Sequence, residues 1–212
     1  MFNKKLGIKV SLVLIFIIAL SSIVYGNELL PKNVAKNLGV SADMGMRFET
    51  LYEYEPTQED KERPSEEYNR LITKVSYAHC GKYVHLWKIE FVEGYTVSES
   101  TINLYLDSDN NVETGRQRNN TLWDGIDVLW TLNNANDEWR LFGYTWNAFG
   151  DESRMDYLAT FIPDGNVVYC RYDLMKNKVG SEFVFRARLT SEMPSKTVSR
   201  TPWFDVKAKV YD

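Results

Sequence analysis

The sequence predicts an all-β fold: an antiparallel β-sandwich of jelly-roll or immunoglobulin-like type, with about nine strands, behind an N-terminal signal peptide. Three observations predict it. Apolar and polar residues alternate along most of the chain after residue 70, which is the two-residue period of a half-buried strand. Clusters of turn-forming residues recur about every ten residues. No stretch between them has the period of a long helix.

The expected strands each place apolar side chains on one face, as a sheet packed on a core requires. Two strands over 71–78 and 83–92 flank a hairpin turn at 79–82. The other apolar faces are Ile102, Leu104 and Leu106; Ile126, Val128, Trp130 and Leu132; Val168, Cys170, Tyr172 and Leu174; Phe183, Phe185, Ala187 and Leu189; and Phe204, Val206, Ala208 and Val210. Trp130 shares such a face and is expected in the core.

Residues 1–26 have the composition of a cleaved signal peptide. Lys4, Lys5 and Lys9 precede an apolar run from Val10 to Leu20, which is shorter than the roughly 20 residues of a membrane span. Small residues at positions 24 and 26 suit signal peptidase. The sequence therefore predicts an exported protein, periplasmic or extracellular, with no membrane span after cleavage.

The rest of the chain divides into two parts. Segment 27–66 is expected to be irregular, with a short helix over 33–40, a first strand over 46–55 and a charged loop over 56–67. Segment 67–212 is expected to form the sandwich domain, with a long surface loop at 191–202. The sequence predicts no particular oligomeric state.

Composition excludes several classes of protein. Aromatic residues make up 14% of the chain, which argues against a disordered or collagen-like protein. The net charge of −4 gives no reason to expect a nucleic-acid partner. Cys80 and Cys170 allow one disulfide in an exported protein, with two free thiols as the alternative. No catalytic motif is present, so no catalytic residue is predicted.

Acidic and amide side chains recur at alternate positions after one strand. They are Asp107, Asp109, Asn111 and Glu113. Calcium prefers six to eight oxygen ligands, and alternate residues of a tight loop can converge on one ion. These four residues are therefore predicted to bind a structural calcium ion. The alternative is a metal-free turn held by Asx-type hydrogen bonds.

The same region resembles a known family. The pattern D-x-D-N-N-x-x-T-G, followed by G-x-D and an apolar strand, occupies residues 107–115 and 125–127. It resembles DOMON-like β-sandwiches and in particular family 9 carbohydrate-binding modules. The resemblance implies the sandwich fold and a binding module with a carbohydrate ligand. Other DOMON-like proteins bind haem, which would make His85 and a methionine such as Met155 candidate ligands.

Sugar rings stack on flat aromatic faces, and polar neighbours bind the hydroxyl groups. The predicted ligand-binding residues are aromatic residues near strand ends together with adjacent polar residues. They are Trp87, Trp123, Trp146, Tyr144, Asn147 and Arg118. The alternative for each tryptophan is burial in the core of the sandwich.

These observations favour a secreted, non-catalytic module that binds a poly- or oligosaccharide. Three alternatives stay open at this point. One is a structural interaction domain of the cell envelope without a small ligand. Another is a small glycan-active enzyme, which would need a pair of carboxylates across a cleft. The third is a DOMON-like domain that carries haem.

Overall fold

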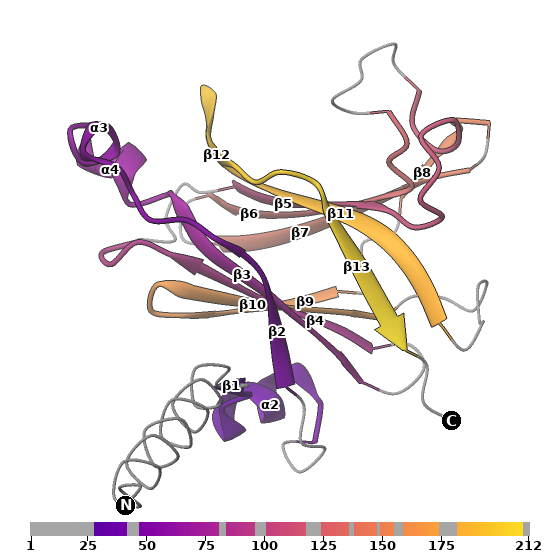
Figure 1. The fold of residues 1–212 in the computed structure, drawn as a ribbon, viewed down its shortest axis with the longest axis horizontal. Coiled ribbons are helices and arrows are strands. Elements are labelled where there is room, and N and C mark those ends of the chain that lie inside the picture. Colours follow the sequence, from indigo (N-terminus) through magenta and orange to yellow (C-terminus); the bar gives the residue numbers. More distant parts are fainter. Residues whose placement is uncertain are drawn as a thin grey trace, which may run out of the picture.

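The structure is a computed structural model that describes residues 28–41, 47–80, 84–95, 101–117, 124–135, 138–147, 149–154, 159–173 and 182–209. The predicted signal peptide lies outside these residues. Two antiparallel sheets pack face to face (Figure 1), which confirms the predicted β-sandwich. Thirteen strands are described, more than the nine expected, because several short edge strands lack a clear alternating pattern.

The first sheet has six strands in the order β1-β2-β3-β4-β10-β9. Their bounds are β1 Glu28–Leu29, β2 Arg47–Glu53, β3 Ile72–Cys80, β4 Val84–Phe91, β9 Ala159–Asp164 and β10 Val167–Asp173. β3 and β4 form the predicted hairpin, with His79 opposite His85. β2 pairs with β3, so the segment before residue 67 contributes a strand to the sandwich.

The second sheet has seven strands. They are β5 Thr101–Asp107, β6 Val128–Ala135, β7 Glu138–Trp146, β8 Glu152–Arg154, β11 Glu182–Met193, β12 Lys196–Arg200 and β13 Phe204–Lys209. The order is β12-β11-β5-β6-β7-β8, and β13 also pairs with β11. β11 and β12 form a hairpin across 191–200. The predicted surface loop at 191–202 is therefore wrong, because strand pairing extends through its polar residues.

The core lies between the two sheets. Apolar side chains of both inner faces form one cluster, which includes Trp87, Trp130, Leu104, Val168 and Phe185. Burying a side chain of this size stabilises the fold by about 1.5–3 kcal/mol. This cluster confirms the predicted apolar faces over the described residues of β5, β6 and β10, and it confirms the core position of Trp130. The polar residues that alternate with them are thereby directed to the outer faces. Ile126, which was predicted to share the face of Val128, instead lies before β6 and packs in a separate cluster with Tyr105 and Trp146.

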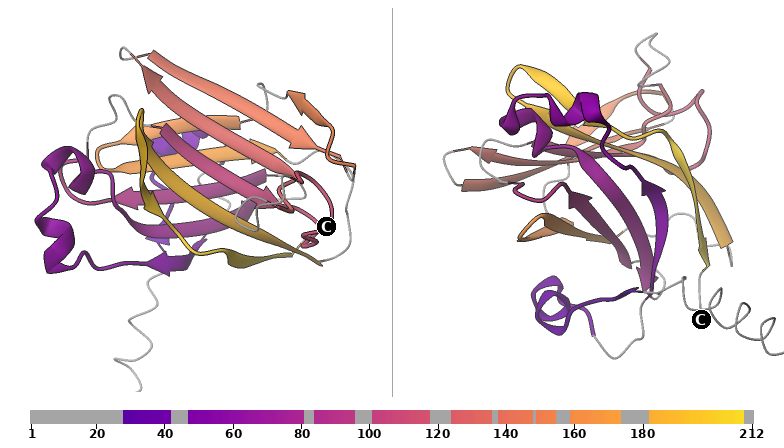
Figure 2. Two further views of the ribbon diagram at one scale, coloured as in Figure 1. Left: turned by 90° about the horizontal axis from the view of Figure 1, so that it is seen from above. Right: turned by 60° about the vertical axis from the view of Figure 1, so that its left-hand side comes forward.

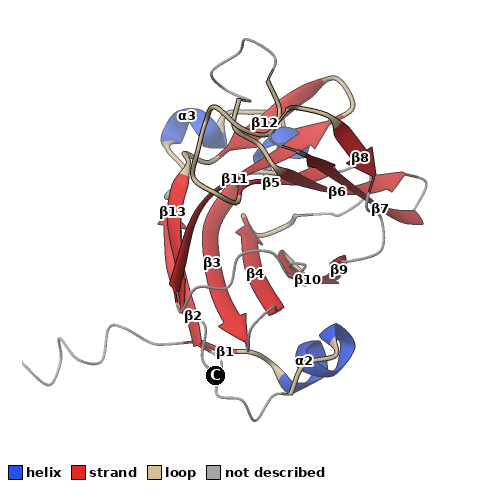
Figure 3. Ribbon diagram, turned by 90° about the vertical axis from the view of Figure 1, so that its right-hand side faces the viewer, coloured by secondary structure: helices blue, strands red, loops and turns tan. Residues whose placement is uncertain are grey.

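Helix α2, Lys32–Leu38, covers the outer face of the six-stranded sheet (Figure 3). Its Val34, Ala35 and Leu38 pack with Ala78 and Leu86 in a second apolar cluster. The helix ends at Gly39, which has the left-handed backbone conformation with φ of 66°. Arg171 of β10 donates hydrogen bonds to the carbonyls of Leu38 and Gly39. Helix α2 thus covers part of the outer face of the six-stranded sheet.

Two short helices replace the charged loop expected at 56–67, so that prediction is wrong. They are α3 Gln58–Lys61 and α4 Ser65–Tyr68. Thr57 and Asp60 form a capping box at the start of α3, in which each side chain accepts from the backbone N–H of the other. Asp60 is buried and also accepts from the Tyr54 hydroxyl. This local bonding orders a stretch that has too few apolar residues to be read as structure from its sequence.

Two further findings concern the described part of the chain. Cys170 is a free and fully buried thiol, so it is not bridged to Cys80. Among the described helices, none has the length and apolar character needed to cross a membrane.

Asp60 gives the fold a pH dependence that can be measured. The hydrogen bond from Tyr54 is the largest influence that lowers the pKa of Asp60. A carboxylate whose pKa is lower in the folded protein than in the unfolded chain stabilises the fold. This stabilisation is complete at pH values above the pKa in the unfolded chain, which is near 4, and it is lost as the pH falls through the pKa in the folded protein. We expect Asp60→Asn to cost about 1–3 kcal/mol at pH 7, and the difference from wild type to vanish at low pH.

Urea unfolding between pH 7 and pH 2 measures this difference. Glu59→Gln is the matched control, because Glu59 lies one residue away on α3 and is exposed. A loss in Asp60→Asn that stays constant across the pH range would show that the charge of Asp60 does not contribute.

Candidate functional site

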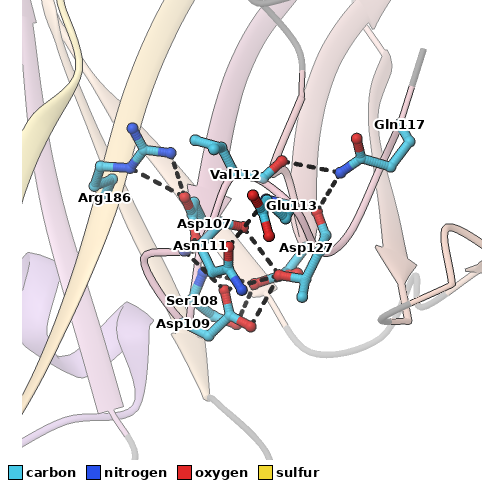
Figure 4. A network of polar contacts seen from close by, with 10 residues as sticks. Asp107, Ser108, Asp109, Asn111, Val112, Glu113, Gln117, Asp127 and Arg186 are labelled. Atoms are coloured by element: carbon cyan, nitrogen blue, oxygen red, sulfur yellow. Dashed lines mark hydrogen bonds and ion pairs between the residues drawn. The ribbon is translucent and has the colours of Figure 1, made fainter. Parts of the chain in front are cut away.

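Three carboxylates come together where β5 ends. The chain leaves β5 at Asp107, turns through residues 108–117 and reaches the entry to β6 at Asp127. Carboxylate oxygens of Asp107, Asp109 and Asp127 all lie within 4.8 Å of one another. Figure 4 shows these side chains gathered inside the turn, with Arg186 of β11 reaching Asp107. We call residues 107–117 the Asp loop.

The Asp loop is held by bonds among its own residues. The backbone N–H of Asn111 donates to Asp107 at 3.0 Å and to Asp109 at 3.1 Å. The Thr114 hydroxyl donates to Asp109 at 3.0 Å. Side chains that bond nearby backbone N–H groups in this way define Asx turns. The predicted alternative of an Asx-bonded turn is therefore part of the observed geometry.

Asp127 joins the Asp loop to the second sheet. Its carboxylate accepts from the backbone N–H of Ser108 at 2.8 Å and from the Ser108 hydroxyl at 2.7 Å. The two glycines of the motif make this approach possible. A side-chain carbon at Gly115 would lie 2.6 Å from the Ile126 carbonyl oxygen, and one at Gly125 would lie 2.7 Å from Val112 Cα. Both glycines have positive φ, so larger residues would be strained as well as crowded.

The carboxylates of this site could hold a cation. Asp107 is fully buried and accepts from Arg186 Nε at 3.0 Å and from a second guanidinium nitrogen. Burial raises the pKa of Asp107 and of Asp127, because low polarity disfavours the charged carboxylates. Among the described residues, Arg186 thus binds the first of three close carboxylates. Each carboxylate oxygen can accept more than one bond, so these oxygens also fit a hard divalent cation.

The predicted ligand set is only partly assembled. Asp107 and Asp109 belong to the group, and Asp127 joins them, which the alternating pattern did not indicate. Glu113 is exposed and lies outside the group. The Asn111 side-chain oxygen accepts from the backbone N–H of Glu113 at 3.0 Å. Calcium at this site stays a prediction.

Aromatic side chains form a second feature on the outer face of the seven-stranded sheet. Strand pairing places Arg188, Tyr105, Leu129 and Tyr144 in one row across β11, β5, β6 and β7. Figure 2, left, looks down on this side of the sandwich, and no described helix crosses the sheet. Tyr105 and Tyr144 of this row belong to a cluster with Trp146 and Trp203, and we call these four aromatic residues the aromatic row. Tyr144 and Trp203 are partly exposed, whereas Tyr105 and Trp146 are buried.

A ladder of polar side chains runs beside this row. Asn103 donates to the Thr190 hydroxyl at 3.1 Å and accepts from the Thr131 hydroxyl at 2.7 Å. One register further along, Asn133 donates to Thr101 at 2.8 Å. Cross-strand bonds of this kind fix the positions of the side chains on a pleated surface. The outer face is therefore rigid, with amide and hydroxyl groups beside the aromatic row.

Arginines lie over the aromatic rings. The guanidinium carbon of Arg116 lies 5.5 Å from the Trp146 ring centroid. Those of Arg186 and Arg188 lie 5.3 Å and 5.0 Å from the Trp203 centroid. These distances are within the range of cation–π attraction. Both tryptophans are thus flanked by positive charge.

Phe149 is exposed to an extent that is unusual for its size. Its side chain is 90% exposed, yet its turn is well bonded. Asn147 accepts from the backbone N–H groups of Phe149 and Asp151 and donates to the Asp151 carboxylate. The adjacent Gly150 lies close to Gly115 of the Asp loop. A large ring is therefore presented to solvent from a defined position near Trp146.

The structure places the predicted ligand-binding residues in different environments. Trp87 has no exposed surface and packs in the core, so its indole offers no face to a sugar. Trp146 is buried beside Arg116, and Tyr144 is partly exposed on the outer face. The Asn147 amide is engaged in its turn. Trp123 and Arg118 lie outside the described residues.

Sequence reasoning missed Phe149 and the arginines that lie over the rings of Trp146 and Trp203. The run Asn147–Asp151 carries a turn signal with an aromatic residue inside it, which was enough to indicate an exposed ring. The arginines gave no local signal, because the tryptophan rings that they contact belong to other segments of the chain.

The two histidines lie inside the sandwich rather than in an open site. His85 is fully buried, and its Nδ1 lies 2.8 Å from the Tyr77 hydroxyl oxygen. Its ring stacks on Tyr172 with centroids 4.9 Å apart. Burial lowers the pKa of His85 to about 3, so the imidazole is neutral at physiological pH. Met155, its suggested partner in haem binding, lies outside the described residues.

An open hollow of about 540 Å³ is lined by Glu53, Tyr54, Lys74 and Glu90, among others. It lies at the end of the first sheet near α3. Glu53 is paired with Lys74 at 3.1 Å, and Glu90 with Lys88 at 3.0 Å. Both carboxylates in this hollow are thus paired with lysines.

Comparisons with known proteins give one similar structure to report. It is a family 9 carbohydrate-binding module from Caldicellulosiruptor kristjanssonii in complex with cellotriose, with 12% sequence identity and a TM-score of 0.31. The match covers 76% of this chain and 72% of that chain. At that TM-score the likeness does not bear on ligand or mechanism. A scan against protein-family models gives no match, and neither does a search of curated proteins.

The Asp loop allows a direct test of metal binding. If calcium binds the three carboxylates, wild-type protein melts at a higher temperature in calcium than in EDTA. The gain is about 2.7 kcal/mol when free calcium is one hundred times its Kd. We expect Asp127→Asn to lose this gain, because it removes one ligand charge while keeping an oxygen for Ser108. In EDTA the variant should melt no lower than wild type, because one repelling carboxylate is gone.

Differential scanning calorimetry in both buffers measures the effect. Glu113→Gln is the matched comparison, since Glu113 is acidic and near but outside the group, and it should keep the calcium gain. If Asp127→Asn keeps the calcium gain, Asp127 is not a calcium ligand. If wild-type protein melts at the same temperature in calcium and in EDTA, the loop does not bind calcium.

Proposed function

We propose that this chain is a non-catalytic carbohydrate-binding module, exported from the cell, that holds a poly- or oligosaccharide on the outer face of the seven-stranded sheet. The observation that carries the proposal is the aromatic row on this face. Tyr144 and Trp203 keep part of their surface exposed although both belong to a packed cluster. Rigid, partly exposed rings on a sheet suit the apolar faces of sugars, and little conformational entropy is lost when they bind.

Polar groups beside the rings support the proposal. Thr131 and Asn133 are partly exposed and stand next to the aromatic row. Hydroxyl and amide groups can both donate and accept hydrogen bonds, as the hydroxyls of a sugar require. Their positions are set by the cross-strand ladder, which gives the face a fixed pattern of donors and acceptors.

Phe149 supplies a further contact surface. A phenylalanine that is 90% exposed contributes little to folding, because little of its apolar area is removed from water. A ring held in a bonded turn is nevertheless well placed to stack on a ligand. Binding at Phe149 would extend the site from the aromatic row toward the Asp loop.

The Asp loop has a structural part in this proposal. Its side chains bond to one another and to the ends of β5 and β6, and calcium would reinforce these bonds. The loop positions Arg116 and the turn of Phe149, so it shapes one border of the site. The alternating oxygens and the group of three carboxylates support calcium as the ion. The apolar run before residue 20 supports export.

Removal of the Phe149 ring tests the function. We expect Phe149→Ala and Tyr144→Ala each to weaken glycan binding about tenfold, because each removes one stacking ring, an interaction of order 1 kcal/mol or more. Phe149→Ala should leave the melting temperature unchanged, since substitutions at exposed sites alter stability by less than about 0.5 kcal/mol. Binding is measured by glycan array and then by calorimetry on the best ligand.

Tyr68→Ala is the matched control, because Tyr68 is also a partly exposed aromatic residue but lies on α4. It should bind as wild type does. A folded protein that binds no glycan in the array, with and without calcium, would refute the proposal and favour an envelope interaction domain. Release of shorter sugar chains during long incubation would instead indicate an enzyme.

A further inference from the structure

Arg186 of β11 contacts both the Asp loop and the aromatic row. Its Nε donates to Asp107 Oδ2 at 3.0 Å, and a second guanidinium nitrogen donates to the same oxygen. Its guanidinium carbon lies 5.3 Å from the centroid of the Trp203 ring, which is within the range of cation–π attraction. Figure 4 shows Arg186 reaching from β11 to Asp107. One guanidinium group is thus shared between a buried carboxylate and a partly exposed indole.

Asp107 fixes the position of Arg186. The Asp107 side chain has no exposed surface, whereas 22% of the Arg186 side chain is exposed. The second oxygen of the carboxylate, Oδ1, accepts from the backbone N–H of Asn111 at 3.0 Å, so the Asp loop holds the carboxylate itself. Two charge-assisted hydrogen bonds from one planar guanidinium group restrict its orientation as well as its distance. Asp107 therefore determines how the guanidinium plane of Arg186 lies relative to Trp203.

Trp203 lies in the segment between β12 and β13, outside the strands. Two residues earlier, the Thr201 N–H donates to the Leu189 carbonyl at 3.0 Å, and the Thr201 hydroxyl accepts from the Leu189 N–H at 3.0 Å. These bonds set the backbone near Trp203 but not the angle of its ring. The guanidinium carbons of Arg186 and Arg188 lie 5.3 Å and 5.0 Å from the ring centroid. The orientation of the indole is therefore set by the side chains that pack against it.

We propose that Arg186 is a positioning residue for the carbohydrate site: Asp107 holds Arg186, and Arg186 holds the Trp203 ring in the orientation that binds sugar. The proposal rests on the carbohydrate-binding function above and adds to it a residue that acts through Trp203. A side chain that becomes immobile only when a ligand binds weakens the affinity by about two- to tenfold. The contacts of Arg186 restrict the ring before the ligand arrives. The Asp loop thus contributes to affinity through a carboxylate that is buried away from the ligand.

Substitution of Arg186 tests its role in affinity. Arg186→Gln removes the cation from the Trp203 ring. We expect about two- to tenfold weaker binding in calorimetric titrations with cellohexaose, xylohexaose and mannohexaose as probes. Arg186→Lys should recover part of this loss, because lysine keeps a positive charge near the ring but lacks the planar group that bonds to Asp107.

A double-mutant cycle keeps the test valid if Arg186→Gln destabilises the fold. Arg186→Gln alone removes the charged partner of the buried Asp107, which is strongly destabilising. Asp107→Asn replaces one oxygen by an amide nitrogen that donates instead of accepting, so the double variant Asp107→Asn/Arg186→Gln carries no buried charge at this position. Asp107→Asn alone should also weaken glycan binding, since it loosens Arg186. The two losses should not add in the double variant, because both act on one contact.

Fluorescence reports the Trp203 ring without any ligand. Acrylamide quenching is measured for each protein with and without the further substitution Trp203→Phe, and the difference gives the signal of Trp203. Arg186→Gln should raise the quenching constant of Trp203, because the indole loses a group that lies over it. Asp107→Asn should raise it by a smaller amount. A role of Arg186 in stability alone would leave this signal unchanged in the folded protein.

Arg63→Gln is the matched control. Arg63 pairs with Asp60 at 2.7 Å, and only 3% of the Asp60 side chain is exposed, so this substitution also breaks an ion pair with a buried carboxylate. Arg63 lies between α3 and α4, away from the outer face of the seven-stranded sheet. Arg63→Gln should lower the melting temperature and leave both the glycan affinity and the quenching of Trp203 unchanged.

Each outcome bears on one proposal. Weaker glycan binding and stronger Trp203 quenching in folded Arg186→Gln or in the double variant, with neither in Arg63→Gln, support the inference. Wild-type affinity in these variants, or unchanged quenching of Trp203, overturns the inference while the carbohydrate-binding function stands. An equal loss of affinity in Arg63→Gln also overturns it, because the effect is then one of stability. If the folded wild-type protein binds none of the probes and no glycan of the array, the carbohydrate-binding function itself is refuted, and the inference falls with it.

Discussion

Strand β5 is the constraint on which the rest of the molecule depends, because its two faces serve different purposes. Ile102, Leu104 and Leu106 point into the core, and Asn103, Tyr105 and Asp107 point outward between them. A shift of one residue in register would exchange the two sets. The core on the inner face therefore fixes which side chains stand on the outer face. The chemistry of the outer face is available because the apolar packing behind it does not allow β5 to slide.

Asp107 is the point at which fold and site meet. It ends β5, it is fully buried, and Arg186 of the neighbouring β11 holds it by two hydrogen bonds. A buried carboxylate needs such a partner, since an unpaired charge in the interior costs several kcal/mol. The same Arg186 lies over Trp203, so one side chain links the Asp loop to the aromatic row. The turn of Phe149 meets the loop at Gly115, which ties a third segment to the same corner.

Much of the fold was predictable from the sequence because alternation reports burial directly. The faces of β5, β6 and β10 follow from it, as does the core position of Trp130. The hairpin at 191–200 was not predictable, because its polar residues alternate with few apolar ones. Helix α3 was not predicted for a similar reason, because its stability comes from hydrogen bonds among Asp60, Thr57 and Tyr54. In the site, the motif located Asp107 and Asp109, but the placement of Arg116 over Trp146 and of Arg186 over Trp203 depends on contacts between separate segments of the chain, which no local pattern reports.

The motif and the binding face therefore have different physical meanings. Residues of the Asp loop bond chiefly to one another and to strand ends, and their glycines are required by close backbone contacts. Such residues specify the corner of a sandwich, whatever the sandwich binds. In the proposed function, ligand choice comes from side chains that the loop and the register bring to the surface but do not themselves determine, such as Phe149 and Tyr144. A protein with the same loop and different residues at these positions would keep the fold, and the proposal expects it to differ in ligand.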